Sequence, residues 1–171
     1  MNLANILTMS RIALVPIYLI LFYSSFENRL LYSGIILILS GITDLLDGYF
    51  ARKYNMVTKL GTMLDPIADK LTTFSVLISF ASIKLIPIWI LIVLGLKEFA
   101  LIIGGGFLYY LENKAIPANM FGKTATLLFY ITVILIVMGL NGLFVSILLY
   151  LTVILHLVAF INYFLIMKRK V

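Results

Sequence analysis

The chain of 171 residues is built mainly from long apolar runs. A bilayer has a hydrocarbon core of ~30 Å, which about 20 residues of α-helix can cross. Six runs suited to this role occupy nearly the whole sequence: Arg11–Phe26, Leu30–Phe50, Leu64–Ile83, Ile86–Leu111, Ala118–Leu140 and Leu143–Met167. They predict an all-α integral membrane protein with six transmembrane helices, preceded by a short interfacial helix in the more polar segment Met1–Ser10.

The composition agrees with a membrane protein and limits its chemistry. Hydrophobic residues make up 63% of the chain, charged residues only 12%, and the mean hydropathy is +1.15, well outside the range of soluble domains. Gly and Pro are scattered rather than gathered in a linker, so we expect one transmembrane domain over residues 1–171. Ser24-Ser25-Phe26 is a poor cleavage site, so we expect the first run to be a retained helix. The absence of cysteine excludes disulfides, zinc-thiolate sites and thiol nucleophiles.

Basic residues favour one side of this predicted topology. With six crossings, that side receives Arg11, Arg52, Lys53, Lys59, Lys114 and the tail Lys168–Lys170. The other side receives Arg29 and Lys84. Because basic segments stay in the cytoplasm, we expect a multi-pass protein of the cytoplasmic membrane with both termini inside the cell. The net charge of +6 then describes a face suited to anionic lipid headgroups or phosphorylated substrates, and nucleic acid is not an expected partner.

All four aspartates lie in one stretch, residues 44–69. A carboxylate in a membrane helix costs about 3 kcal/mol on insertion scales and usually marks a functional site. Asp44 and Asp47 are three residues apart, which places them on one face of their helix. Asp65 and Asp69, four residues apart, likewise share a face of the next helix. An antiparallel hairpin with its turn near Met56 would bring four carboxylates to one depth, within reach of the cytoplasm.

Converging carboxylates favour a metal site. Two divalent cations would cancel the formal charge of four carboxylates, and oxygen ligands without Cys or a nearby His indicate Mg²⁺ or Mn²⁺ rather than zinc. Paired ions of this kind serve displacement at phosphorus, although one carboxylate could instead remain free as a general base. Gly48 and Ala51 leave room beside the acids for a flat or phosphorylated group, and Gly61 does the same on the facing helix. The planar guanidinium group of Arg52 could donate two hydrogen bonds to a phosphate.

The aspartates belong to a longer pattern, Asp-x₂-Asp-Gly-x₂-Ala-Arg-x₈-Gly-x₃-Asp-x₃-Asp, which resembles the signature of the CDP-alcohol phosphatidyltransferases. The pattern is met at Asp44, Asp47, Gly48, Ala51, Arg52, Gly61, Asp65 and Asp69. The six-helix plan and the entry segment Asn5-x₂-Thr8-x₂-Arg11 extend the resemblance over the whole chain. It implies a homodimeric enzyme that moves a phosphatidyl group from CDP-diacylglycerol to an alcohol and releases CMP.

The resemblance also implies roles for single residues. Asp44, Asp47 and Asp65 would be metal ligands, and Asp69 would complete the site and act as general base toward the acceptor hydroxyl. The CDP portion would be held by Asn5, Thr8, Gly48, Ala51, Arg52 and Gly61. The residues by themselves do not say which aspartate is the base.

The acceptor alcohol is the less constrained part. The segment Leu64-Asp65-Pro66-x-Ala68-Asp69-Lys70 and the pair Lys97-Glu98 most resemble the bacterial members of the family that use glycerol 3-phosphate. A phosphorylated acceptor needs cations, for which the candidates are Arg11, Lys59 and Lys123; each could equally be a base that sets topology or contacts lipid. Members that use phosphatidylglycerol and make cardiolipin are the nearest alternative.

Other polar residues in the runs have simpler explanations. His156 stands alone in its run, so we expect a hydrogen bond to a neighbouring helix rather than catalysis. Lys97 and Glu98 are consecutive and diverge by roughly 100° on a helix, so we expect each to find partners on other helices. A divalent cation transporter or channel also uses intramembrane carboxylates, but it would not need Gly48 and Ala51 beside them.

Overall fold

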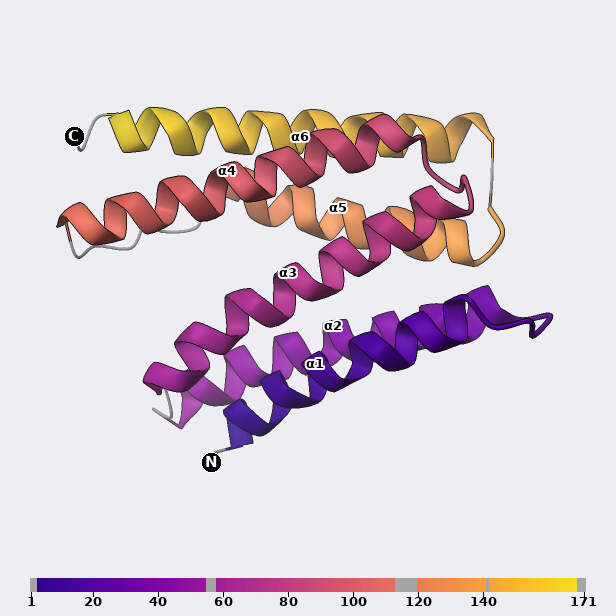
Figure 1. Ribbon diagram of the computed structural model, residues 1–171, viewed down its shortest axis with the longest axis horizontal. Helices are drawn as coiled ribbons and strands as arrows, with labels where there is room; N and C mark the ends of the chain where they lie inside the picture. The colour runs from indigo at the N-terminus through magenta and orange to yellow at the C-terminus, as the bar shows by residue number, and fades with distance from the viewer. Residues whose placement is uncertain (1–2, 55–57, 113–119, 141, 169–171) are drawn as a thin grey trace. The chain divides into compact units, whose positions relative to one another are not determined.

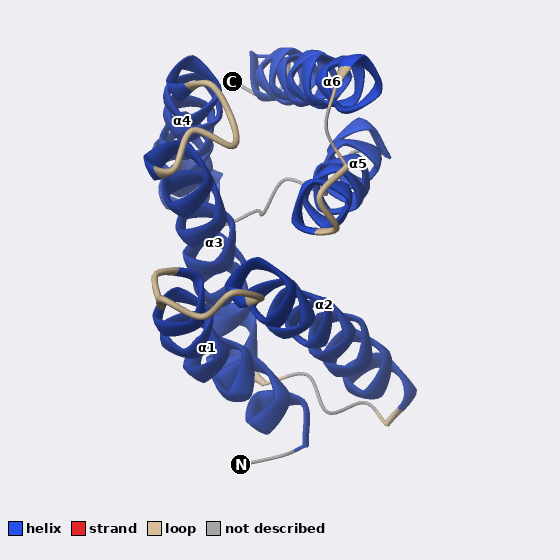
Figure 2. Ribbon diagram, turned by 90° about the vertical axis from the view of Figure 1, so that its right-hand side faces the viewer, coloured by secondary structure: helices blue, strands red, loops and turns tan. Residues whose placement is uncertain are grey.

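The computed structural model describes residues 3–54, 58–112, 120–140 and 142–168, which form six helices and no strand (Figures 1 and 2). The helices are α1 (Leu3–Phe22), α2 (Arg29–Lys53), α3 (Lys59–Ser82), α4 (Ile88–Glu112), α5 (Met120–Val137) and α6 (Leu143–Lys168). They fall into two compact units, residues 1–83 with α1 to α3 and residues 84–171 with α4 to α6. Each predicted apolar run corresponds to one helix, so the all-α fold class is confirmed.

The start of the chain differs from the prediction in one respect. The polar segment before Arg11 is not a separate interfacial helix, because α1 runs without interruption from Leu3 to Phe22. The reason lies in the spacing of Asn5, Thr8 and Arg11, which recur every three residues and therefore share one face of a single helix. All three are buried against α2 and α3, so a continuous helix satisfies them together.

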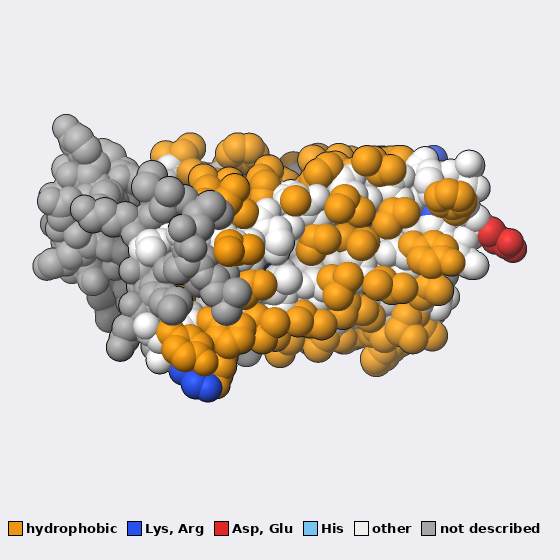
Figure 3. All heavy atoms as spheres, turned by 90° about the horizontal axis from the view of Figure 1, so that it is seen from below, with side chains coloured by type: hydrophobic (Ala, Val, Ile, Leu, Met, Phe, Trp, Pro, Cys, Tyr) orange, Lys and Arg blue, Asp and Glu red, His pale blue; other side chains and the backbone are white. Residues whose placement is uncertain are grey.

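Four of the described helices are long and apolar enough to cross a membrane: Asn5–Phe22, Arg29–Ala51, Met120–Val137 and Leu143–Leu165. Helix α3 fails this criterion because Asp65, Asp69 and Lys70 lie within its apolar run. Helix α4 is long enough to cross a membrane, but its side chains are described only from Ile88 to Gly104, fewer than the roughly 20 residues that a crossing needs. Among the described residues drawn in colour in Figure 3, hydrophobic side chains cover most of the face and the visible charged side chains lie near the ends of the coloured region, as lipid contact requires.

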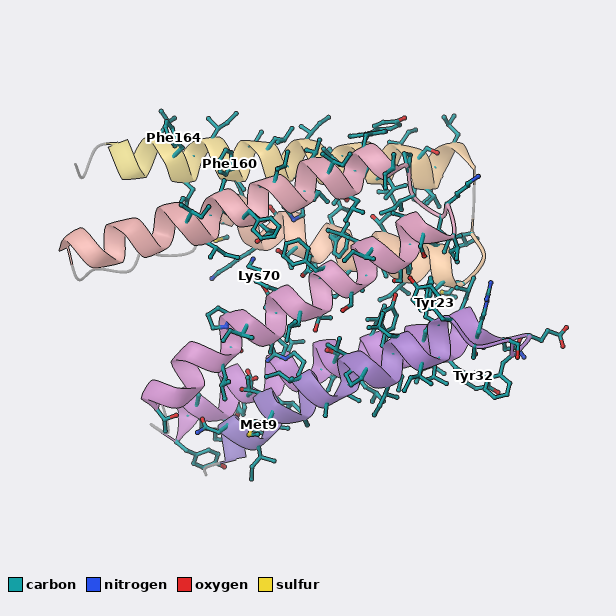
Figure 4. The ribbon with its side chains drawn as sticks, in the orientation of Figure 1. Met9, Tyr23, Tyr32, Lys70, Phe160 and Phe164 are labelled. Carbon is teal, nitrogen blue, oxygen red and sulfur yellow. The ribbon has the colours of Figure 1, made fainter. Side chains whose placement is uncertain are left out.

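In the first unit, α1 packs closely against both α2 and α3. The core between α1 and α3 is aromatic: Phe22 and Phe80 are fully buried and stack with ring centroids 5.6 Å apart. The hydroxyl of Tyr18 is hydrogen-bonded to Ser79, and that of Tyr23 lies 2.9 Å from Ser82 Oγ (Tyr23 is labelled in Figure 4). These contacts fix α1 along α3 at the end away from the aspartates.

In the second unit, α6 packs against both α5 and α4. His156 is buried, its Nδ1 lies 2.9 Å from the carbonyl oxygen of Thr152, and its ring meets the edge of Phe129 on α5. This contact lies within α6, and the expected hydrogen bond from His156 to a neighbouring helix stays a prediction. Glycines 139 and 142 have φ of 79° and 104°, a conformation that lets the chain turn sharply between α5 and α6.

The side chains of Lys97 and Glu98 on α4 are in direct contact, and the expectation that each also has partners on other helices stays a prediction. Both side chains are buried, and the ammonium group of Lys97 forms an ion pair with Glu98 Oε1. Flexible side chains overcome the divergence of consecutive positions, because a charge in an apolar interior gains more from a partner than its side chain loses in freedom.

Further along the same helix, a cavity of about 360 Å³ lies between α4 and α6, lined by apolar side chains and Tyr163; Phe160 and Phe164 are labelled in Figure 4.

Candidate active site

Three of the four aspartates meet in the first unit. Asp44 and Asp47 on α2 and Asp65 on α3 each offer a carboxylate oxygen, and these oxygens lie within 4.8 Å of one another. Asp47 is buried, whereas the side chains of Asp44 and Asp65 are 49% and 52% exposed. The cluster therefore has one buried carboxylate and two that can meet a ligand from outside.

Arg11 of α1 provides the positive charge at this cluster. Its Nη1 lies 2.6 Å from Asp44 Oδ1, and its Nη2 lies 3.3 Å from Asp65 Oδ1. The same Nη2 forms an ion pair with Asp47 Oδ2, which also accepts a hydrogen bond of 3.1 Å from the hydroxyl of Thr8. One buried guanidinium thus ties α1 to both α2 and α3.

The donor set fits a hard divalent cation. The three carboxylates of this cluster carry three negative charges, and Arg11 supplies one positive charge. The oxygens are close enough for one ion to bind several of them, and carboxylates are the ligands that Mg²⁺ and Mn²⁺ prefer. The excess negative charge and the exposure of Asp44 and Asp65 make the cluster suitable for such an ion.

Asp69 lies outside this cluster of three. It follows Asp65 by one helical turn, is about 39% exposed, and its Oδ2 lies 3.6 Å from Nζ of Lys70, which is labelled on α3 in Figure 4. Its charge still interacts with that of Asp44. Of the four carboxylates that the sequence predicts to converge, those of Asp44, Asp47 and Asp65 have oxygens within 4.8 Å of one another.

Asn5 and Gly61 belong to a structural contact at the start of α3. Thr58 caps this helix: its hydroxyl oxygen accepts a hydrogen bond of 3.0 Å from the backbone N–H of Gly61. The hydroxyl in turn donates to Oδ1 of Asn5 at 2.9 Å. A Cβ at position 61 would lie 2.7 Å from that Asn5 oxygen, so glycine is needed for the close approach of α1. The sequence did signal the cap, since a Thr directly precedes the helix.

We expect Gly61→Ala to destabilise the protein by about 1 kcal/mol, because the added methyl group pushes Asn5 off Thr58 and one buried hydrogen bond is lost. In a chain of this size that corresponds to a thermal midpoint lower by about 2–4 °C in detergent micelles. Gly41→Ala is the matched control, since nothing lies within 4 Å of a Cβ there and its midpoint should stay or rise slightly. Equal midpoints for the two variants would contradict the packing role of Gly61.

The remaining candidates are placed as follows. Gly48 and Ala51 are half-buried on α2, on the turns that follow Asp47. Lys123 is exposed near the start of α5, in the second unit. The side chains of Arg52 and Lys59 lie outside the described part of the structure.

Comparison with known proteins identifies the family. The family model of CDP-alcohol phosphatidyltransferase matches residues 1–160. A CDP-diacylglycerol-glycerol-3-phosphate 3-phosphatidyltransferase of Bacillus subtilis (strain 168) is 39% identical over 73% of this chain and 70% of its own length. A protein of the same name from Aquifex aeolicus (strain VF5) is 38% identical over 82% of this chain and 76% of its own.

A relative with another name also matches. It is a cardiolipin synthase (CMP-forming) of Streptomyces coelicolor, 35% identical over 74% of this chain and 60% of its own length. The family is metal-dependent in general, in keeping with the cluster formed by Asp44, Asp47 and Asp65. With its apolar helices and this match over residues 1–160, the chain is a multi-pass membrane protein that belongs to the CDP-alcohol phosphatidyltransferase family.

Proposed function

We propose that this chain transfers a phosphatidyl group from CDP-diacylglycerol to glycerol 3-phosphate, giving phosphatidylglycerophosphate and CMP. The observation that carries the proposal is the cluster of Asp44, Asp47 and Asp65, whose carboxylate oxygens lie within 4.8 Å, in a chain 39% identical to a protein named for this reaction. We further propose that the chain works as a homodimer in the cytoplasmic membrane, with both termini and the site on the cytoplasmic side.

The aspartates would hold two divalent cations, Mg²⁺ or Mn²⁺. Asp44, Asp47 and Asp65 are the proposed ligands of the first, and Asp69 would add the charge that a second ion needs. When bound, such ions neutralise the pyrophosphate of the donor and stabilise the charge that develops at phosphorus. Arg11 and Thr8 hold the buried Asp47 in place for this role.

The nucleotide part of the donor would lie along α2. Gly48 and Ala51 have small side chains on the turns beyond Asp47, so a nucleotide can approach the helix backbone there. Arg52 is the proposed partner of a donor phosphate. Asn5, Thr8 and Gly61 are further proposed contacts of CDP, and the hydrogen bonds of Asn5 and Thr8 also position α1 and Asp47.

Asp69 is the proposed general base. Its carboxylate is partly exposed, in an ion pair with Lys70 that leaves it outside the cluster of three. It would take the proton of the acceptor hydroxyl as that oxygen forms its bond to the phosphorus that carries diacylglycerol. The bond from this phosphorus to the bridging oxygen breaks, and CMP leaves with that oxygen. Arg11, Lys59 and Lys123 remain the candidate contacts of the acceptor phosphate.

The acceptor has one specific alternative. The relative from Streptomyces coelicolor is named a cardiolipin synthase, and it is 35% identical over 74% of this chain. Use of phosphatidylglycerol as acceptor would need no cation for a terminal phosphate, and would place both substrates in the bilayer. Both reactions release CMP from CDP-diacylglycerol, so the acceptor alone distinguishes them.

We expect the purified protein, in detergent with Mg²⁺ or Mn²⁺, to release CMP from CDP-diacylglycerol when glycerol 3-phosphate is supplied. Phosphatidylglycerol, inositol phosphate and serine at the same concentration should give at least ~10-fold less, because each lacks either the terminal phosphate or the shape of the acceptor. CMP is measured by chromatography, and EDTA provides the metal-free control. A preference for phosphatidylglycerol would assign the chain to cardiolipin synthesis. If no CMP is released with any acceptor and the protein passes divalent ions into liposomes, the assignment as an enzyme is wrong and the protein is a transporter or channel.

A further inference from the structure

Arg11 contacts the same three carboxylates that could hold a metal ion. Its two terminal nitrogens reach Asp44, Asp47 and Asp65, and its side chain is only 3% exposed. Two of these contacts use Oδ1 of Asp44 and Oδ1 of Asp65, which are the carboxylates most open to a ligand. A buried guanidinium therefore neutralises part of the negative charge of the cluster.

We propose that Arg11 is the resident counter-cation of this cluster, and that a divalent cation displaces it from Asp44 and Asp65 when it binds. This inference rests on the proposed function in one respect, namely that the reaction requires a divalent cation at the aspartates. Arg11 is then a positioning residue, which holds the three carboxylates together and releases those of Asp44 and Asp65 when the ion binds.

The contacts with Asp44 and Asp65 oppose binding of an ion. A cation bound to these carboxylates would lie close to the guanidinium, and like charges repel strongly where water is scarce. Arg11 forms ion pairs with both of these carboxylates, with N–O distances of 2.6 Å to Asp44 and 3.3 Å to Asp65. Binding of the ion and retention of all three arginine contacts therefore oppose each other.

Asp47 is the carboxylate that would keep Arg11. It is buried, and its Oδ2 accepts hydrogen bonds from both Arg11 and Thr8. Asp44 and Asp65 are about half exposed, so an ion can reach them without opening the core. With Arg11 held on Asp47, one divalent cation brings the three carboxylates and the guanidinium to neutrality, and a second ion would need another carboxylate, such as Asp69.

The test measures binding of Mn²⁺ alone, without substrates, by the loss of the free-ion signal in electron paramagnetic resonance. We expect Arg11→Gln to bind Mn²⁺ about tenfold more tightly than the wild type, because the ion pairs with Asp44 and Asp65 no longer have to be broken. Arg11→Lys should gain a few-fold, since one ammonium group cannot bridge three carboxylates as a fork does. In thermal unfolding, Mn²⁺ should raise the midpoint of Arg11→Gln more than that of the wild type.

Lys70→Gln is the matched control for charge, because Lys70 lies near the site but pairs with Asp69. Its affinity for Mn²⁺ should change by less than about threefold, as expected for a partly exposed charge. If the affinity of Lys70→Gln for Mn²⁺ rises as much as that of Arg11→Gln, the effect is one of overall charge and the proposed displacement of Arg11 is wrong. Unchanged or weaker binding by both Arg11 variants would also overturn it. If the wild type itself binds no Mn²⁺, the metal requirement of the proposed function fails as well.

Discussion

Asp47→Asn is expected to abolish CMP release, with a loss of about 10³-fold, comparable to removal of a group that stabilises transition-state charge. Asp47 is the buried carboxylate of the cluster and the one that Arg11 and Thr8 hold in place. Asparagine has nearly the same shape, and its amide oxygen can still accept from Thr8. The substitution therefore removes a negative charge and a metal ligand while it leaves the packing of α1 on α2 largely intact. The measurement is CMP release with saturating glycerol 3-phosphate and Mg²⁺.

Thr43→Val is the control for Asp47→Asn at almost the same depth in α2. The Thr43 hydroxyl donates to the carbonyl of Ser40 within the helix, so its loss leaves the site untouched. This variant should keep most of the activity and unfold at nearly the same temperature as the wild type. More than a tenth of wild-type activity in Asp47→Asn would show that Asp47 is not an essential ligand.

The helices and the position of the acids could be predicted from the sequence, since both follow from local patterns. Apolar runs of membrane length gave one helix each, and spacings of three and four residues put Asp44 with Asp47 and Asp65 with Asp69. Such spacings fix the face of a helix but not the distance to the next helix. Among the described residues, Asp65 is the member of the second pair whose carboxylate oxygen lies within 4.8 Å of those of Asp44 and Asp47.

The role of Arg11 could not be predicted for the same reason. Its spacing from Asn5 and Thr8 predicts a polar face on the first helix, which could point inward under the acids or belong to an amphipathic entry helix at the membrane surface, and the sequence does not decide between the two. A topology-setting base and a buried counter-cation have the same sequence signature, a lone arginine beside an apolar run. Burial and three carboxylate contacts distinguish them only once the tertiary structure is known.

Asp69→Asn is expected to lower transfer by about 10²–10⁴-fold, the range for removal of a general base. Because Asp69 lies outside the cluster of Asp44, Asp47 and Asp65, the variant should still bind CDP-diacylglycerol in the presence of Mn²⁺, within about twofold of the wild type. The two measurements are CMP release and retention of labelled CDP-diacylglycerol by the purified variant. A carboxamide cannot take the acceptor proton, whereas it can still contribute a neutral oxygen near the donor.

Asp69→Glu tests the role of Asp69 as general base with a variant that keeps the carboxylate. It keeps a carboxylate that can accept a proton but moves it by about one bond length, so activity should be intermediate between those of the wild type and Asp69→Asn. If Asp69→Asn loses donor binding completely, then Asp69 is a metal ligand on which the donor depends and the base must be sought elsewhere. Donor binding by both variants, with transfer retained only by Asp69→Glu, would show that the carboxylate of Asp69 acts on the acceptor. Asp44, Asp47 and Asp65 would then be the metal ligands and Asp69 the general base.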